Sequence, residues 1–115
     1  KPAIHRSGQD LGWLAAAIDQ RLGTELRVSA LAREAHMERS HFSRSFASQF
    51  GLSPAQYVRK RRIERACQML AGSDDSMAEI ACQLGFVDAF HFSKAFKLVM
   101  GVPPREFRSR GGVLP

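Results

Sequence analysis

Two short segments share three identical residues followed by a cation: His41-Phe42-Ser43-Arg44 and, 50 residues later, His91-Phe92-Ser93-Lys94. Each segment sets a small hydroxyl beside a long cation. An arginine can donate two parallel hydrogen bonds to guanine O6 and N7, and short neighbours let a helix approach the base edges closely. The pattern therefore suits a helix in the major groove of double-stranded DNA, although a single face of this kind is more often simply solvated.

The match extends beyond these segments, because six residues recur identically at the same offset. The further identical pairs are Phe46 and Phe96, Gly51 and Gly101, and Pro54 and Pro104. Upstream, Leu31-Ala32 corresponds to Ile80-Ala81 at an offset one residue shorter. Six identities at one offset indicate a tandem duplication, and so two similar lobes.

Each repeat predicts a short helix, a tight turn and a longer helix, which is helix-turn-helix geometry. Ser76 and Glu79 form a capping-box pattern, and Asp88 is a good N-cap residue for the next helix. In the first repeat Arg27 stands where Ser76 stands in the second, so its cap should be poorer. The predicted helices cover residues 28–35, 38–50, 54–71, 77–84 and 89–100, preceded by an amphipathic helix that starts near Leu11 and is ended by Gly23. No strand alternation is present.

The longer helix of each repeat has an aromatic stripe and an opposite, more polar face. The stripes, Phe42-Phe46-Phe50 and Phe92-Phe96-Met100, must face a core. In the first repeat the opposite face carries Ser40, Arg44 and Ala47, with Arg39 and Ser43 alongside. In the second it carries Phe90, Lys94 and Lys97, with His91 and Ser93 flanking them. Because this arrangement occurs twice, we favour DNA contact over a solvated face.

The helix between the repeats carries the run Arg59-Lys60-Arg61-Arg62, with Arg65 beyond it. These cations are candidates for phosphate contacts, which position a protein on DNA without specifying sequence. A helix of ~18 residues is roughly 27 Å long, and successive major grooves on one face of DNA lie about 34 Å apart. One chain could then fill two neighbouring grooves, at an asymmetric site of about two turns.

Composition narrows the function classes. The 115 residues include 17 basic and 11 acidic ones, a net charge of +6, and 13 of the basic residues are arginine, which binds phosphate bidentately. No apolar run reaches the ~20 residues of a membrane span. Catalytic and metal-binding motifs are absent, so we expect no enzyme, no cofactor and no metal site. Cys67 and Cys82 are interpreted as small buried apolar residues of a reduced, cytoplasmic protein.

A group of residues in the second repeat resembles the signature of the DNA-binding domain of the AraC/XylS family of bacterial transcription regulators. The carrying residues are Ile80-Ala81, Gly85-Phe86, Asp88, His91-Phe92-Ser93-Lys94, Phe96-Lys97, Gly101, Pro104 and Phe107-Arg108. The first repeat and the helix between also fit, so the resemblance covers about residues 10–110.

The resemblance implies an all-α fold of seven helices, with two helix-turn-helix lobes joined by a long connecting helix. The expected division is a frayed segment 1–9, a first lobe 10–52, a connecting helix 53–72, a second lobe 73–108 and a frayed tail 109–115. Together with the free faces, it assigns base contacts to Arg39, Ser40, Ser43, Arg44, Ala89, Phe90, His91 and Lys94. Phosphate contacts are assigned to Arg59, Arg62, Ser93, Lys97 and Arg108.

Two features depart from the family pattern. Glu38 replaces the small cap residue usual before the first longer helix, so the cap should be weaker. Ala89 and Phe90 are apolar where many members have polar side chains. Phe90 is open to two interpretations, contact with a thymine methyl group or packing into the core.

The sequence therefore predicts the DNA-binding output domain of a bacterial transcription regulator, most simply an activator, in the cytoplasm and on the nucleoid. A contact with RNA polymerase is an expected partner interaction, and a helical module that docks on polymerase or another acidic protein is the alternative function. No membrane partner is expected. Because the first residue is Lys1 and the first methionine is Met37, we expect an N-terminal sensing or dimerisation domain outside this chain.

Overall fold

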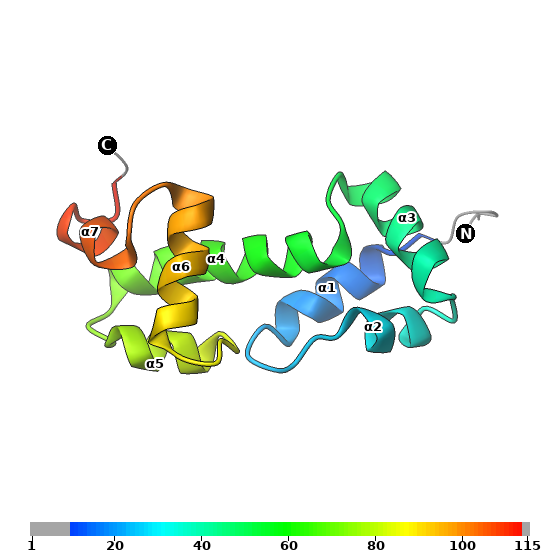
Figure 1. The fold of residues 1–115 in the computed structure, drawn as a ribbon, viewed down its shortest axis with the longest axis horizontal. Helices are drawn as coiled ribbons and strands as arrows, with labels where there is room; N and C mark the ends of the chain where they lie inside the picture. Colours follow the sequence, from blue (N-terminus) through cyan, green and yellow to red (C-terminus); the bar gives the residue numbers. More distant parts are fainter. Residues whose placement is uncertain (1–9, 114–115) are drawn as a thin grey trace. The chain divides into compact units, whose positions relative to one another are not determined.

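Residues 10–113, the part of the chain that the computed structural model describes, form seven α-helices and no strand (Figure 1). The helices are α1 (Gly12–Gln20), α2 (Val28–Glu34), α3 (Arg39–Phe50), α4 (Pro54–Gly72), α5 (Met77–Gln83), α6 (Ala89–Met100) and α7 (Pro104–Ser109). The predicted all-α fold with two helix-turn-helix lobes is confirmed. Only α7 had no separate basis in helical periodicity and came from the family resemblance.

The described chain divides into two compact units. The first unit takes in the chain up to Arg21 together with Leu26–Val58, and the second takes in Leu22–Glu25 and the chain from Arg59 onward. The expected connecting helix is thus shared between the units. Its first turn belongs to the first unit, where Tyr57 packs its ring 5.3 Å from that of Phe46.

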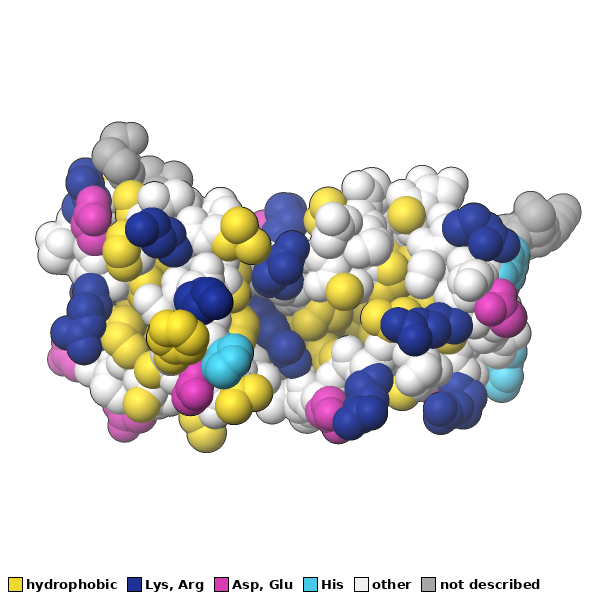
Figure 2. Space-filling view, in the orientation of Figure 1, with side chains coloured by type: hydrophobic (Ala, Val, Ile, Leu, Met, Phe, Trp, Pro, Cys, Tyr) yellow, Lys and Arg dark blue, Asp and Glu magenta, His cyan; other side chains and the backbone are white. Residues whose placement is uncertain are grey.

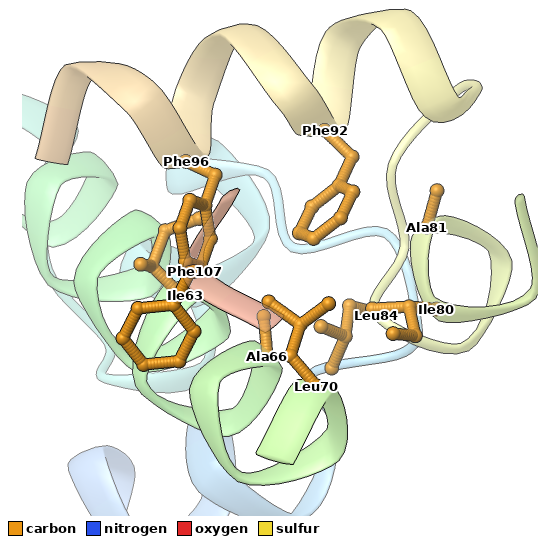
Figure 3. Close-up of a cluster of buried hydrophobic side chains, with 9 residues drawn as sticks. All are labelled: Ile63, Ala66, Leu70, Ile80, Ala81, Leu84, Phe92, Phe96 and Phe107. Atoms are coloured by element: carbon orange, nitrogen blue, oxygen red, sulfur yellow. The ribbon is translucent and has the colours of Figure 1, made fainter. Parts of the chain in front are cut away.

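The longer helix of each repeat contributes aromatic side chains to the core of its unit. Phe42 and Phe46 of α3 are fully buried, as are Phe92 and Phe96 of α6, which confirms the predicted facing of both stripes. In the second unit the two rings of α6 point towards side chains of α4 and α5 (Figure 3). That core consists of Ile63, Ala66, Leu70, Ile80, Ala81, Leu84, Phe92, Phe96 and Phe107.

The helix caps largely follow the sequence. Ser76 and Glu79 make the reciprocal capping box of α5, and the Ser53 hydroxyl accepts from Gln56 N at 3.2 Å at the start of α4. Gly51 and Gly101 end α3 and α6 in the left-handed conformation, with φ of 78° and 85°. Arg27 makes no side-chain cap for α2, as expected.

The weak cap expected at Glu38 is wrong. Its carboxylate accepts hydrogen bonds from Ser40 N and His41 N, both at 3.1 Å. The longer side chain of glutamate folds back over the first turn and reaches two of the backbone N–H groups that a helix leaves unpaired at its start.

Two predicted ends also differ. Helix α1 stops at Gln20, before Gly23; a Cβ on Gly23 would lie 2.5 Å from the Gln83 carbonyl oxygen, so glycine is needed there for close backbone approach. The tail is ordered further than expected, because Gly111 N and Gly112 N donate to Arg108 O and Phe107 O at 2.9 Å. The predicted frayed segment 1–9 and residues 114–115 lie outside the described part.

Candidate nucleic-acid interface

The outer face of α3, defined as Arg39, Ser40, Ser43 and Arg44, lies opposite the buried phenylalanines. Arg39, Ser40 and Arg44 are exposed and Ser43 is half-buried. The helix therefore presents two guanidinium groups and two hydroxyls within its first two turns. Residues at the start of the second helix of a helix-turn-helix are those that reach base edges.

Glu38 adds a fixed negative charge at the start of this face. The backbone hydrogen bonds from Ser40 and His41 hold the pKa of the Glu38 carboxyl below its ordinary value, and the charge of Arg44 acts in the same direction. The carboxylate therefore occupies the N-terminus of α3. At a helix N-terminus without such a cap, the free backbone N–H groups would attract a phosphate. The outer face of α3 is left to bind through its side chains.

The outer face of α6, defined as Ala89, Phe90, His91 and Lys94, is chemically different. Phe90 is 65% exposed, so its side chain does not belong to the core, and His91 and Lys94 are exposed as well. The Lys94 ammonium lies 5.3 Å from the centre of the Phe90 ring. Of the two interpretations of Phe90, inward packing is therefore wrong.

Asp88 holds the start of α6 and also orients His91. Its Oδ1 accepts from His91 N at 2.8 Å and lies 2.7 Å from His91 Nδ1. These hydrogen bonds, the backbone one first, keep the pKa of the Asp88 carboxyl below its ordinary value. The imidazole is thus tied to the helix cap through one ring nitrogen, with its other edge turned away from that contact.

The basic run of α4 is less free than its sequence suggests. Lys60 Nζ lies 3.2 Å from Glu64 Oε2, and Arg61 pairs with the other oxygen of the same carboxylate. Arg59 and Arg65 are exposed, as is Lys97 on α6, and Ser93 is half-buried. Arg59 and Lys97 therefore remain candidates for phosphate contact.

Arg62 does not fit its predicted role as a phosphate contact. The guanidinium is half-buried and donates to Leu22 O at 2.9 Å and Thr24 O at 2.6 Å. It also lies 5.9 Å from the centre of the Phe86 ring, and burial lowers the pKa of the group. Arg62 therefore fastens Leu22–Glu25 to α4 within the second unit.

Arg108 does not fit its predicted role as a phosphate contact either, because its guanidinium is also bound to backbone carbonyl groups. Its Nε donates to Leu70 O at 3.0 Å, and its two terminal nitrogens donate to Asp75 O and Ser73 O at 2.6 and 3.1 Å. All three nitrogens of the guanidinium bind carbonyl oxygens at the α4–α5 connection. Sequence alone identified a cation at this position and not the carbonyl groups that the fold brings to it.

The two cysteines are less buried than the sequence predicted. Cys82 is exposed and Cys67 is half-buried, so the interpretation of both as buried residues is wrong. Partial burial raises the pKa of the Cys67 thiol.

Val87 is 85% exposed immediately before the cap of α6. Sequence reasoning missed this feature because a valine in a loop has no periodic pattern. Within residues 10–113, no helix is long and apolar enough to cross a membrane.

Comparison with known proteins agrees with this architecture. A family model described as a helix-turn-helix domain matches residues 31–110. The MmsAB operon regulatory protein of Pseudomonas aeruginosa is 34% identical over 107 residues, covering 93% of this chain and 35% of the relative. The chain thus spans about a third of the length of the curated relatives that it matches.

Solved structures give the same result. The DNA-binding domain of AdpA, a global transcriptional factor crystallised with a target DNA, superposes with a TM-score of 0.84 at 30% identity, covering 87% of this chain and 90% of that one. An AraC-type transcriptional regulator from Chromobacterium violaceum superposes with a TM-score of 0.76 at 25% identity, covering 84% and 86%.

The fold and its two outer faces define a double helix-turn-helix domain. The chain belongs to the AraC/XylS family of helix-turn-helix regulators. This is a family of transcription regulators and not of enzymes.

Proposed function

We propose that this chain binds double-stranded DNA sequence-specifically and is the output domain of a bacterial transcription regulator that activates its genes. The observation that carries the proposal is the repeated construction of α3 and α6. Each helix buries two phenylalanines completely and exposes a cation, Arg44 or Lys94, at equivalent positions. A solvated surface has no need for the same arrangement twice.

The proposed base contacts are those of the two outer faces: Arg39, Ser40, Ser43, Arg44, Ala89, Phe90, His91 and Lys94. The proposed phosphate contacts are Arg59, Ser93 and Lys97. Arg62 and Arg108 leave this set, because their guanidinium groups are already bound to backbone carbonyls.

The two outer faces are not copies of each other, so the two half-elements of the site should differ in sequence. Because a single chain carries both helices, it needs no second copy to make two contacts. We place the helices in neighbouring major grooves, at an asymmetric site of about two helical turns.

The longer relatives suggest how the domain is used. We place this domain in a regulator with a separate sensing or dimerisation domain, acting in the cytoplasm on the nucleoid. A surface of the domain that remains free on DNA would contact RNA polymerase.

Selection of bound duplexes from a random pool, followed by footprinting, tests the proposal. The expected result is an enriched asymmetric sequence and protection of about two turns on one face of the DNA. Binding should remain selective at ~0.2 M salt, where non-specific electrostatic binding is weak. Equal affinity for random duplex under those conditions would refute the proposal.

A further inference from the structure

Helix α6 carries an exposed aromatic side chain near its start, Phe90. Phe90 is 65% exposed although it lies at the second position of a capped helix, and Val87 just before the cap is 85% exposed. In Figure 2, hydrophobic side chains lie beside a histidine on the surface over the start of α6. An apolar side chain at this place could contact an apolar group in the DNA groove.

Polar neighbours fix where such a ligand could lie. The Phe90 ring stands edge-on to His91, at 5.8 Å and 88°, and the Lys94 ammonium lies 5.3 Å from its centre. His91 is itself held by Asp88 at 2.7 Å. The apolar ring is therefore bordered by a cation, which favours a ligand that is apolar at one point and surrounded by negative charge.

The major groove offers one apolar group among its base edges, the C5-methyl group of thymine. The phosphates on either side of the groove supply the surrounding negative charge. A phenyl ring can contact this methyl group by burying apolar surface, without any hydrogen bond.

We infer that Phe90 is a specificity-determining residue that reads the C5-methyl group of a pyrimidine in the major groove. The inference rests on the proposed DNA binding and deepens it. The first unit has no such contact, because the offset of 50 residues places Ser40 at the position of Phe90. One half-element should thus depend on a methyl group at this position and the other should not.

The test uses the duplex that the chain selects from a random pool. Each thymine is replaced in turn by deoxyuridine, which removes only the methyl group. At one position in the half-element bound by α6, the affinity should fall about fourfold, the value expected for loss of one buried carbon. In the Phe90→Ser variant the same replacement should have no effect.

A second readout adds the methyl group instead of removing it. Cytosine and 5-methylcytosine are placed in turn at the sensitive position. The methylated duplex should bind more tightly by about the same factor of four, and Phe90→Ser should bind both duplexes equally.

Leu98→Ser is the matched control, because Leu98 is 71% exposed on the same helix, two turns beyond Phe90. This variant should keep the full deoxyuridine effect, and circular dichroism should show both variants folded. A deoxyuridine effect that persists in Phe90→Ser, or no effect at any thymine, would overturn the inference while leaving sequence-specific binding intact. Failure to select any sequence would instead overturn the proposed function.

Discussion

Helices α3 and α6 can be compared position by position, because the offset of 50 residues aligns them from cap to cap. Both begin at an acidic cap and end at a left-handed glycine. Their fully buried positions are identical, a phenylalanine in each case. The positions of the outer faces differ: exposed Arg39, Ser40 and Arg44 correspond to half-buried Ala89 and to exposed Phe90 and Lys94.

The comparison shows that packing and recognition use separate residues of one helix. A buried ring must match its neighbours in volume, so a change there costs stability. An exposed side chain meets no such limit and can differ between the units without disturbing the fold. The first unit presents arginines and hydroxyls, and the second presents an aromatic ring with a lysine.

The largest expected effect concerns what the two helices share. Phe46→Ala and Phe96→Ala should each destabilise their unit by about 3–5 kcal/mol, because each ring is fully buried. Denaturant unfolding measures the loss, and hydrogen exchange identifies the unit that opens. Unchanged midpoints for either variant would contradict the common packing.

The next largest effect is a difference in stability between variants of Arg108 and of an exposed arginine on the same helix. Arg108→Ala removes hydrogen bonds to three carbonyl oxygens and should lower the free energy of unfolding by about 1.5–3 kcal/mol. Arg105→Ala, on the exposed side of the same helix, should change it by less than about 0.5 kcal/mol. Equal stabilities for the two variants would return Arg108 to the candidate phosphate contacts.

The exposed cations test the difference between the outer faces. Arg44→Ala should cost ~1–3 kcal/mol of binding and relax the preference at one base pair, because arginine forks onto guanine. Lys94→Ala should cost less and spread its effect over several base pairs, since an ammonium group is a point charge. Affinities for all single-base variants of the selected duplex measure both. A sharper base preference at Lys94 than at Arg44 would reverse this assignment.

Phosphate contacts should change the salt dependence and leave the preference intact. Lys97→Ala or Arg59→Ala should weaken binding to all duplexes alike and reduce the salt slope by about 1. Arg62→Ala should lower stability with the slope unchanged, because its guanidinium is bound to Leu22 O and Thr24 O. Titrations at several salt concentrations distinguish the two behaviours.

The smallest effect is on the acidic caps, which the two helices have in common. The pKa values of Glu38 and Asp88 are lowered by their hydrogen bonds, so their stabilisation is present near neutrality and is lost as pH falls through the folded values. Stability should therefore decline slightly between about pH 5 and pH 3. Glu38→Gln and Asp88→Asn should flatten that decline, and an unaltered pH profile in both would contradict it.

Much of the fold follows from local patterns in the sequence. The helices from α2 to α6 were predicted to within a residue or two, because caps, glycine stops and aromatic periodicity all act over a few residues. The end of α1 was predicted wrongly. Gly23 does not end that helix; a glycine is required there because the backbone passes close to the carbonyl oxygen of Gln83. Helix α7 has only six residues, too few for a clear period.

The candidate site was predictable where exposure follows from helix geometry. Arg39, Ser40, Arg44, His91 and Lys94 are all exposed, as the position opposite a buried stripe requires. The exposure of Phe90 could not be predicted in this way, because an aromatic side chain next to a helix cap can either pack into the core or lie on the surface. The structure decides for the surface.

The sequence by itself determined the repeat, because the same residue types recur at an offset of 50 residues. It also determined the helices and the side chains that each outer face presents, since these depend on residues within a few turns of one another. The tertiary structure decided which cations remain available for a ligand. In the sequence, Arg62 and Arg108 resemble ordinary surface cations. In the structure, each guanidinium donates to backbone carbonyl groups that lie 33 to 40 residues away along the chain. Folding brings those unpaired oxygens together, and no pattern in the sequence encodes where they meet.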